Sequence, residues 1–144
     1  MELVKQISVF VENASGKLSK ITSILAEGGI NIRALSIADT TDFGILRMIV
    51  QDPEKAVSIL LDNDIMVKST EVIVVGIDDE PGGLNKALCL LRDSSVTLDY
   101  LYAFVSKHEN EAYVIMKTDH AEEAVKALSA GGVRVLQAKE VYGL

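Results

Sequence analysis

Residues 7–18, ISVFVENASGKL, and residues 73–84, IVVGIDDEPGGL, are two versions of one pattern, sixty-six positions apart. In each version an apolar run leads into a polar turn that ends in glycine, and a leucine follows two residues later. Further matched positions are Ile30 with Val96, Leu35 with Leu101 and, after one or two inserted residues, Met48 with Ile115. Such self-similarity indicates one folding unit used twice, and two copies are too few for a solenoid. We therefore expect two small, pseudo-symmetric domains, residues 1–70 and residues 71–144.

The composition excludes several classes of protein. The chain has 144 residues, of which 49% are hydrophobic, and a formal net charge of −7. Its fourteen lysines and arginines do not cluster, so no basic face can neutralise phosphates, and we expect no nucleic-acid partner. No apolar stretch reaches the length of a membrane span, and the N-terminus opens on a strand pattern instead of a signal peptide. One cysteine cannot form an internal disulfide, which fits a reducing compartment. We expect a cytoplasmic protein with no membrane partner.

Periodicity predicts six elements in the first copy. Ile7, Val9 and Val11 alternate with other residues, which is the period of a strand, and the following residues change to helical spacing. The expected elements are a strand over 4–12, a helix that Gly28-Gly29 ends, strands over 30–38 and 43–51 around a polar hairpin, a helix opened by Asp52-Pro53, and a strand from Ile65. This order, β-α-β-β-α-β, is the split βαβ arrangement.

The second copy repeats the order. The expected elements are a strand over 71–78, a helix carrying Leu84 to Leu91, strands over 96–106 and 111–117, a helix that Gly131-Gly132 ends, and a strand over 133–142. Residues 65–78 form one nearly unbroken extended segment without a flexible linker, so we expect the two domains in a fixed relation. The fold class is therefore α+β, with two ferredoxin-like βαββαβ units whose antiparallel sheets carry helices on one face.

Two further patterns bear on function. The apolar phase slips in both second strands, from Ile32 to Leu35 and from Leu98 to Leu101, which indicates either a β-bulge or a strand with both faces partly buried. The strands at 43–51 and 111–117 are apolar on both faces, although a sheet with one solvated face should alternate. Something must cover the second face, so we expect a homodimer or a face-to-face pairing of the domains.

The search for catalytic or metal-binding groups finds little. His108 and His120 form no metal-ligand spacing with Cys89, and each is better explained as a capping or solvated residue. Cys89 lies in an apolar helix, where an inert core thiol is expected. The acidic run over 78–80 is best explained as a solvated turn that also caps a helix. We expect no catalytic residue, no metal and no cofactor.

The turn between the first strand and the first helix remains, and it occurs twice. Its glycine lets the backbone approach a ligand closely. The helix that begins there presents unpaired N–H groups and a partial positive charge, which suit a carboxylate. A purely structural role in a tight turn would be the alternative for either glycine alone.

These turns resemble a known family. Residues 11–18, VENASGKL, followed by Gly29-Ile30-Asn31-Ile32, resemble the ACT domain, a small regulatory module of amino-acid-metabolism enzymes. Residues 79–84, DEPGGL, look like the D-x-P-G-x-L form of the same turn in that family. The resemblance covers essentially all 144 residues, with no enzyme domain left over.

The resemblance implies amino-acid binding at an interface between two ACT units, where the turn of one unit faces the second strand of another. It places polar residues at Asn13 and Asn31 on the ligand, the loop of Asn13 opposite Thr97 and Asn31 opposite Asp79. Ser15 stands where the family usually has proline, and Asp79 and Thr97 replace amides, so the two sites would differ chemically. The residues expected to line the sites are Asn13, Ala14, Ser15, Gly16, Lys17 and Leu18 in the first turn, Asp79, Pro81, Gly82 and Leu84 in the second, and Asn31, Thr97 and Leu98 at the second strands.

The resemblance favours a non-catalytic protein that binds a small amino acid and modulates a partner enzyme or regulator. The alternative is a regulatory or interaction subunit of a biosynthetic complex such as acetolactate synthase, in which the duplicated unit mainly supplies a surface. An enzyme in its own right would need an unrecognised acid–base pair in the apolar interface.

Overall fold

The computed structural model describes residues 1–12, 15–39, 43–105 and 108–144. The chain forms two compact units, and each is described by itself. The N-terminal unit comprises Lys5–Thr70 with Tyr142–Leu144, and the C-terminal unit comprises Glu71–Val141 with Met1–Val4. Each unit thus includes a few residues from the far end of the chain. The division into separately folding domains after residue 70 stays a prediction.

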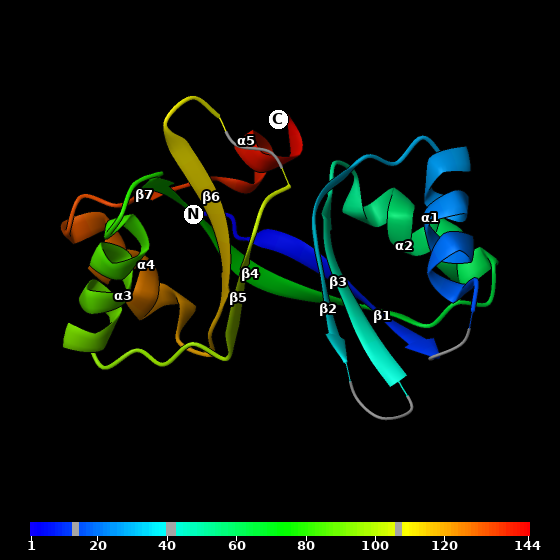
Figure 1. Cartoon of the computed structure of the whole chain (residues 1–144), viewed down its shortest axis with the longest axis horizontal. Coiled ribbons are helices and arrows are strands. Elements are labelled where there is room, and N and C mark those ends of the chain that lie inside the picture. The colour runs from blue at the N-terminus through cyan, green and yellow to red at the C-terminus, as the bar shows by residue number, and fades with distance from the viewer. Residues whose placement is uncertain (13–14, 40–42, 106–107) are drawn as a thin grey trace. The chain divides into compact units, whose positions relative to one another are not determined.

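The N-terminal unit has the expected β-α-β-β-α-β order (Figure 1). Its elements are β1 (Val4–Glu12), α1 (Lys17–Glu27), β2 (Ile32–Asp39), β3 (Phe43–Val50), α2 (Pro53–Asp62) and the first part of β4 (Val67–Asp78). The strand order is β2-β3-β1-β4, and β3 pairs antiparallel with both β1 and β2. The predicted start of α2 is confirmed, because Asp52 accepts a hydrogen bond from the Lys55 N–H at 3.1 Å and Pro53 follows it.

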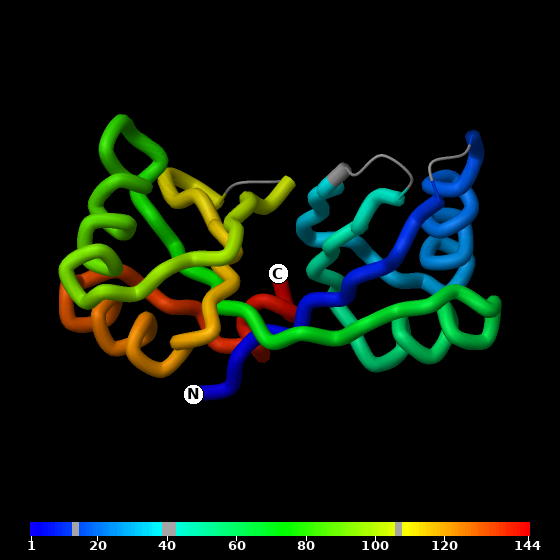
Figure 2. The backbone as a smooth tube through the Cα atoms, turned by 90° about the horizontal axis from the view of Figure 1, so that it is seen from below, coloured from blue at the N-terminus to red at the C-terminus, as the bar shows by residue number. Residues whose placement is uncertain are grey.

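The core of this unit lies on the face of the sheet that α1 and α2 cover. Figure 2 shows these two helices side by side on one face. The buried side chains that meet there are Ile7, Val9 and Val11 of β1, Ile21 and Leu25 of α1, Leu46, Met48 and Val50 of β3, and Ala56 and Leu60 of α2. Each large apolar side chain buried in this way contributes about 1.5–3 kcal/mol. The alternating strand and the helical spacing read from the sequence are both confirmed.

The C-terminal unit repeats the arrangement. Its elements are the second part of β4, α3 (Gly83–Asp93), β5 (Tyr100–Ala103), β6 (Glu111–Lys117), α4 (Ala121–Ala130), β7 (Arg134–Val135) and α5 (Ala138–Tyr142). β4 pairs antiparallel with both β6 and β7, and β5 pairs with β6. Since a strand has two edges, the order is β7-β4-β6-β5, which matches β4-β1-β3-β2 in the N-terminal unit. Helices α3 and α4 cover one face, over a core that includes Ile73, Val114 and Leu128 (Figure 1).

The second face of each sheet also carries buried apolar side chains. Ile49 on β3 and Ile115 on β6 have no exposed surface, and Tyr113 on β6 keeps 6% of its surface exposed. The apolar character of both faces was read correctly from the sequence. A homodimer or a pairing of the domains as its cause stays a prediction.

The end of the chain differs from the prediction. The strand expected over 133–142 is wrong, because β7 has two residues and a short helix, α5, follows it. Ala138 and Val141 are buried at helical spacing, and the Glu140 carboxylate accepts the Gln137 N–H at 3.3 Å, as in a capping box. This local hydrogen bonding outweighs the extended propensity of the valines. Helix α5 lies on the side of the sheet away from α3 and α4 (Figure 1).

The two second strands also differ from one another. In β2 the register shifts between Ile32 and Ala34, where the apolar phase slips, which agrees with the bulge of the two alternatives. In the second copy the strand expected over 96–106 is wrong in extent, because β5 begins only at Tyr100. Residues 96–98 lie before this strand, and the Val96 N–H donates to the Leu91 carbonyl at 2.9 Å.

Both chain ends are anchored by hydrogen bonds. In the C-terminal unit the Ala138 N–H donates to the Glu2 carbonyl at 3.3 Å, and Leu3 packs against the core. In the N-terminal unit the Tyr142 hydroxyl accepts the Lys5 N–H at 2.8 Å, and the Tyr142 carbonyl accepts from the Arg33 guanidinium at 3.2 Å. Glu2, Leu3 and Tyr142 therefore belong to the structure of the units.

Candidate functional site

The first candidate site is the turn between β1 and α1. Gly16 is the N-cap of α1, with φ 83° and ψ −2°, a left-handed conformation that glycine adopts without strain. Its carbonyl accepts the Lys20 N–H at 3.0 Å, which is the first helical bond. The N–H groups of the residues between them therefore precede the helical ladder. Asn13 and Ala14, predicted to line the site, lie outside the described residues.

The second candidate site is the corresponding turn between β4 and α3. Gly82 is its N-cap, with φ 88° and ψ −8°, and its carbonyl accepts the Lys86 N–H at 2.9 Å. The Asp79 N–H donates to the Asn110 carbonyl at 2.8 Å, which ties this turn to the segment before β6. The two turns thus have the same geometry although only the glycine and the leucine are shared.

These helix starts differ from those of α2 and α4. Helices α1 and α3 have no side-chain cap and no acidic residue in the first turn. In contrast, α2 has the Asp52 cap and Glu54, and α4 has Glu122 and Glu123 in its first turn. An acidic side chain at a helix start satisfies its N–H groups and its partial positive charge. The start of α1 keeps both for another anion, whereas at α3 the Gly83 N–H already donates to the Glu80 carbonyl at 3.0 Å. Capping of α3 by a side chain of the acidic run over 78–80 stays a prediction.

Space is available at both turns. A β-carbon built on Gly16 or Gly82 would meet no atom within 4 Å. Ser15 and Pro81, the residues before these glycines, are exposed. A small anion can therefore reach both helix starts from solvent.

Gly83 has a different constraint. A β-carbon at this position would lie 2.0 Å from the Asp78 carbonyl oxygen, so no side chain fits without a backbone shift. The first copy has Lys17 at the same place. This close approach was not predicted, although a glycine pair after proline is a readable signal of a tight turn.

The leucines that follow the glycines are not equivalent. Leu84 is partly buried and packs against the core of the C-terminal unit, so its main role is structural. Leu18 keeps 41% of its surface exposed and is available to a ligand.

Asn31 lies at the other end of α1, after the glycines that end the helix. Its N–H donates to the Gln51 side chain, and its carbonyl accepts the Gln51 N–H at 3.1 Å. Helix α1 has 11 residues, so roughly 16 Å separates Asn31 from the turn at Gly16. The two therefore do not form one site within the N-terminal unit. A role for Asn31 in a site shared with another unit stays a prediction.

Thr97 and Leu98 precede β5 and are not on a strand. The Thr97 carbonyl accepts the Thr118 hydroxyl at 2.8 Å, so one of its lone pairs is already used. Leu98 is partly buried against the core of its own unit. Thr97 is exposed and stays a predicted ligand contact.

The hollow beside the second turn is dominated by paired charges. It has a volume of about 440 Å³ and is lined by residues that include Asp78, Glu111 and Arg134. The Arg134 guanidinium donates to Glu111 at 2.6 Å and also to Glu140. A hydrogen bond with Tyr113, opposed by partial burial and helped by both carboxylates, raises the pKa of Arg134. Because Arg134 is already paired with two carboxylates, this hollow offers little to an added anion.

The histidines and the cysteine have structural surroundings. His108 stacks on Tyr113 with ring centroids 5.1 Å apart. His120 is the N-cap residue of α4 but makes no side-chain cap, and its N–H donates to the Thr118 hydroxyl at 3.2 Å. Cys89 is only half-buried and contacts the Asn85 side chain, so the expected core position is wrong.

Over the described parts of the chain, no group of three or more His, Cys, Asp or Glu side chains could hold a metal ion. No helix in those parts is long and apolar enough to cross a bilayer.

Comparisons with known proteins agree with this fold. A family model described as an ACT domain pair matches residues 2–142. The solved structure of protein BT0572 from Bacteroides thetaiotaomicron is 38% identical, with a TM-score of 0.92 over 99% of this chain and 97% of that chain. The ligand-free regulatory subunit of aspartate kinase from Thermus thermophilus is 17% identical, with a TM-score of 0.64 over 90% and 94%. Aspartate kinase from Synechocystis is 20% identical, with a TM-score of 0.59 over 92% of this chain and 26% of that chain. The last two likenesses concern the fold alone. No curated protein sequence matches the chain.

Proposed function

The chain belongs to the ACT domain pair family, and on that premise we propose that it is a non-catalytic regulatory protein that binds a small amino acid. The amino acid changes the activity of a partner enzyme or transcriptional regulator on another polypeptide. Allostery needs two coupled sites. In this proposal the glycine turns provide the ligand site, and the site whose activity changes lies on the partner.

One observation supports this proposal most strongly. Helices α1 and α3 both begin at a glycine with positive φ, without a side-chain cap and without an acidic residue in the first turn. The other two long helices have acidic first turns. The two uncapped starts are also the two turns that carry the family pattern. Their N–H groups and the helix dipole suit the carboxylate that every amino acid carries.

The remaining contacts stay predictions. The Asn13 amide would bind the ligand at the first turn, and Thr97 would provide a contact from a second ACT unit. Asp79 at the second turn would repel a carboxylate but accept an ammonium group, so we expect the two turns to differ in affinity.

A thermal-shift screen of the twenty amino acids tests the proposal. A ligand at a hundred times its dissociation constant stabilises the folded state by about 2.7 kcal/mol. For a chain of this size, that corresponds to a rise in Tm of roughly 5–10 °C. Gly16→Val should remove the shift for a ligand bound at the first turn, and Gly82→Val for one bound at the second. If no amino acid at millimolar concentration raises the Tm, the proposal is wrong.

A second candidate is an interaction subunit of a biosynthetic enzyme complex, and the edge strands favour it. β2 and β5 end the strand order of their units, and both expose apolar side chains: Leu35 (42%), Ile37 (46%) and Leu101 (39%). Exposed apolar groups on a sheet edge are typical of association with another chain, including a second copy in a homodimer. Sedimentation equilibrium of the wild type and of Leu35→Glu would measure this association. Stable co-purification with a large enzyme, without any response to amino acids, would favour this candidate over the first.

A further inference from the structure

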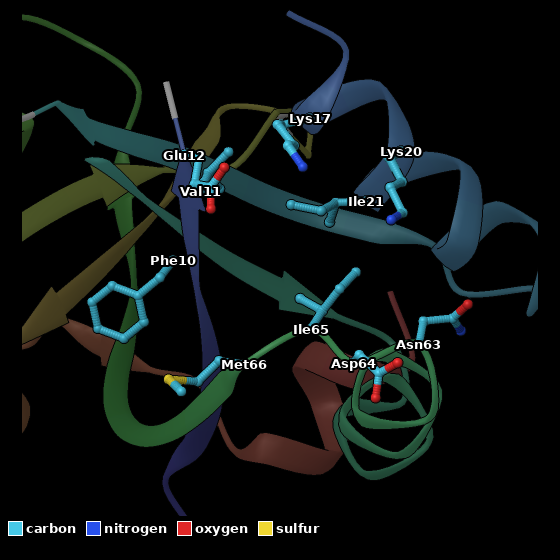
Figure 3. A pocket seen from close by; sticks show the side chains of 10 residues that line it. All are labelled: Phe10, Val11, Glu12, Lys17, Lys20, Ile21, Asn63, Asp64, Ile65 and Met66. Atoms are coloured by element: carbon cyan, nitrogen blue, oxygen red, sulfur yellow. The ribbon is translucent and has the colours of Figure 1, made fainter. Parts of the chain in front are cut away.

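The N-terminal unit contains a cavity on the side of α1 that faces the connection between α2 and β4. Its volume is about 300 Å³. Figure 3 shows its wall, which is formed by the end of β1, the first two turns of α1 and the residues from Asn63 to Met66. This volume is at the lower limit of ligand sites and is sufficient for a molecule of amino-acid size.

One end of the cavity is apolar. Val11 and Ile21 are buried and form its floor, together with Ile65. Phe10 and Met66 lie together at this end in Figure 3 and keep 51% and 71% of their surfaces exposed. Two large apolar side chains exposed beside a cavity provide a surface that a bound apolar group would cover.

The rest of the wall carries four charged side chains. Lys17 and Lys20 extend from α1, Glu12 ends β1, and Asp64 follows α2. Throughout the described residues, none of the four takes part in an ion pair within 4.0 Å. Two ammonium groups and two carboxylates that do not neutralise one another can bind a ligand that carries one charge of each sign.

Asp64 closes the C-terminal end of α2. Its φ is 59°, in the left-handed region, which aspartate adopts more readily than most residues with a β-carbon. The Asp64 N–H donates to the Leu61 carbonyl at 3.0 Å and the Ile65 N–H to the Leu60 carbonyl at 2.9 Å, as in a Schellman motif. The second copy has Gly131-Gly132 where the first has Asn63-Asp64, and Gly132 has a φ of 83°. The first copy therefore carries a carboxylate beside the cavity at a position where the second copy has none.

The corresponding region of the C-terminal unit keeps only part of this chemistry. Asp78 and Lys86 match Glu12 and Lys20, but Gly83 replaces Lys17, Gly132 replaces Asp64, and Arg134 replaces Met66. Arg134 is paired with Glu111, whose carboxylate lies within 3 Å of where a side chain on Gly76 would begin. Among the described residues, the full set of four charges beside exposed apolar side chains is therefore found in the first copy alone.

We propose that this cavity binds a free α-amino acid with a large apolar side chain. The ammonium groups of Lys17 and Lys20 bind its carboxylate, and the carboxylates of Asp64 and Glu12 bind its ammonium group. Its apolar side chain lies over Ile65 between Phe10 and Met66. This site uses side chains, whereas the site of the proposed function uses the backbone amides of the helix start. The N-terminal unit can therefore bind two different amino acids, or the same amino acid at two sites.

A titration of the ¹⁵N-labelled full chain with L-phenylalanine, followed by heteronuclear NMR, tests the proposal. Saturable shifts should appear at the amides of residues 63–66 and 10–12, and glycine, which lacks an apolar side chain, should produce them at least tenfold more weakly. Shifts that do not saturate, or that avoid both segments, would overturn the proposal.

Matched variants test the charged contacts. Asp64→Asn keeps a residue that tolerates positive φ and removes the charge. Asp64→Asn and Lys20→Ala should each weaken phenylalanine binding at least fivefold. The controls are Asp62→Asn, at an exposed acid outside the cavity, and Lys86→Ala, at the lysine that corresponds to Lys20 in the second copy. Both controls should bind within twofold of the wild type, and equal binding by all four variants would contradict the assignment.

A further variant separates this site from the helix start. Ser19→Glu adds an acid to the first turn of α1 and should weaken an amino acid bound to the helix amides. The phenylalanine shifts at residues 63–66 should remain in this variant. If they disappear, the helix start is the only site in this unit and the cavity proposal fails, while the proposed function stands.

Discussion

At the residue scale, the glycines of the two turns carry different constraints. Gly16 and Gly82 are needed for their positive φ, whereas Gly83 is needed because the Asp78 carbonyl occupies the space of a side chain. We expect Gly83→Ala to destabilise the protein by about 2 kcal/mol or more, because a β-carbon would force the backbone apart. Urea unfolding measures this. Lys17→Ala, at the same position of the first copy, should change the free energy of unfolding by less than about 0.5 kcal/mol. Equal effects at the two positions would show that the close contact has no energetic importance.

The ion pairs of Lys117 can be tested by measuring stability as a function of pH. Its ammonium group lies 3.5 Å from Asp99 and 3.1 Å from Asp119. Burial lowers the pKa of Lys117, but the hydrogen bonds and charges of the two carboxylates outweigh it, so the pKa is raised above 10.5. A raised pKa means that the stabilisation is complete below pH 10.5 and is lost as the pH rises through the folded-state value.

We therefore expect Lys117→Met to be less stable than the wild type by about 1 kcal/mol at pH 8. The difference should shrink only at a pH above 10.5, as the wild type loses the charge on passing through its raised pKa. Urea midpoints in both pH ranges measure this, with Lys126→Met, an exposed lysine on α4, as the control. A difference that does not change with pH would assign the effect to packing.

The roles of some single residues could be predicted from the sequence, and the roles of others could not. The two N-cap glycines and Asp52-Pro53 were predicted, because their chemistry acts within a few residues of the chain. Leu84 and Leu98 were expected at a ligand site, whereas both pack against the core of the C-terminal unit, in keeping with the apolar positions that the two copies share. The charged cavity wall was missed because its residues come from three segments, although the replacement of Asn63-Asp64 by Gly131-Gly132 in the second copy was visible.

At the element scale, an acidic residue added at the start of α1 or α3 should stabilise the fold and weaken ligand binding. Ser19→Glu and Asn85→Glu each place an acid in an uncapped first turn. We expect each to raise the free energy of unfolding by about 0.3–1 kcal/mol, because the carboxylate interacts with the helix dipole. Each should also weaken an amino acid bound at its own turn, since the new acid competes for the same N–H groups. Calorimetric titration and urea unfolding of the same samples measure both. Ser23→Glu, in the middle of α1, is the control and should change neither.

Element type was predicted better than element extent. The long periodic segments β1, α1 and α3 were placed correctly because their apolar spacing is unambiguous. The prediction for the end of the chain was wrong because a five-residue helix has only two buried positions, which is too few to show a helical period. The valines there favour a strand when no other signal is present. β5 was predicted too long because Val96 and Leu98 are apolar in an irregular connection, where no period distinguishes them from a strand.

At the scale of the whole molecule, each unit is completed by the far end of the chain. Tyr142 is held in the N-terminal unit through the Lys5 N–H and the Arg33 guanidinium. The Nε atom of Arg33 is buried and has no partner among the described residues. The hydrogen bond to the Tyr142 carbonyl is therefore important for satisfying this guanidinium group. A chain without residues 142–144 would leave more donors unpaired, at about 1–3 kcal/mol each.

We expect this truncation to increase amide exchange in β1 and β2 of the N-terminal unit, and to leave α3 and α4 unchanged. Tyr142→Phe, which removes only the hydroxyl, should have a smaller effect of about 1 kcal/mol. Hydrogen exchange measured by NMR resolves the two units. Equal protection in all three proteins would mean that the C-terminal residues contribute nothing to the N-terminal unit.

The central claim is that the uncapped helix starts of an ACT domain pair bind the carboxylate of an amino acid. The most direct measurement is a calorimetric titration of the full chain with the best amino acid from the thermal screen and with its α-carboxamide, in which an uncharged amide replaces the carboxylate. Hydrogen bonds to a charged group contribute about 1.5–3 kcal/mol, so we predict that the carboxamide binds at least tenfold more weakly. Equal affinity for the two compounds would contradict the account, because the carboxylate would then have no part in binding.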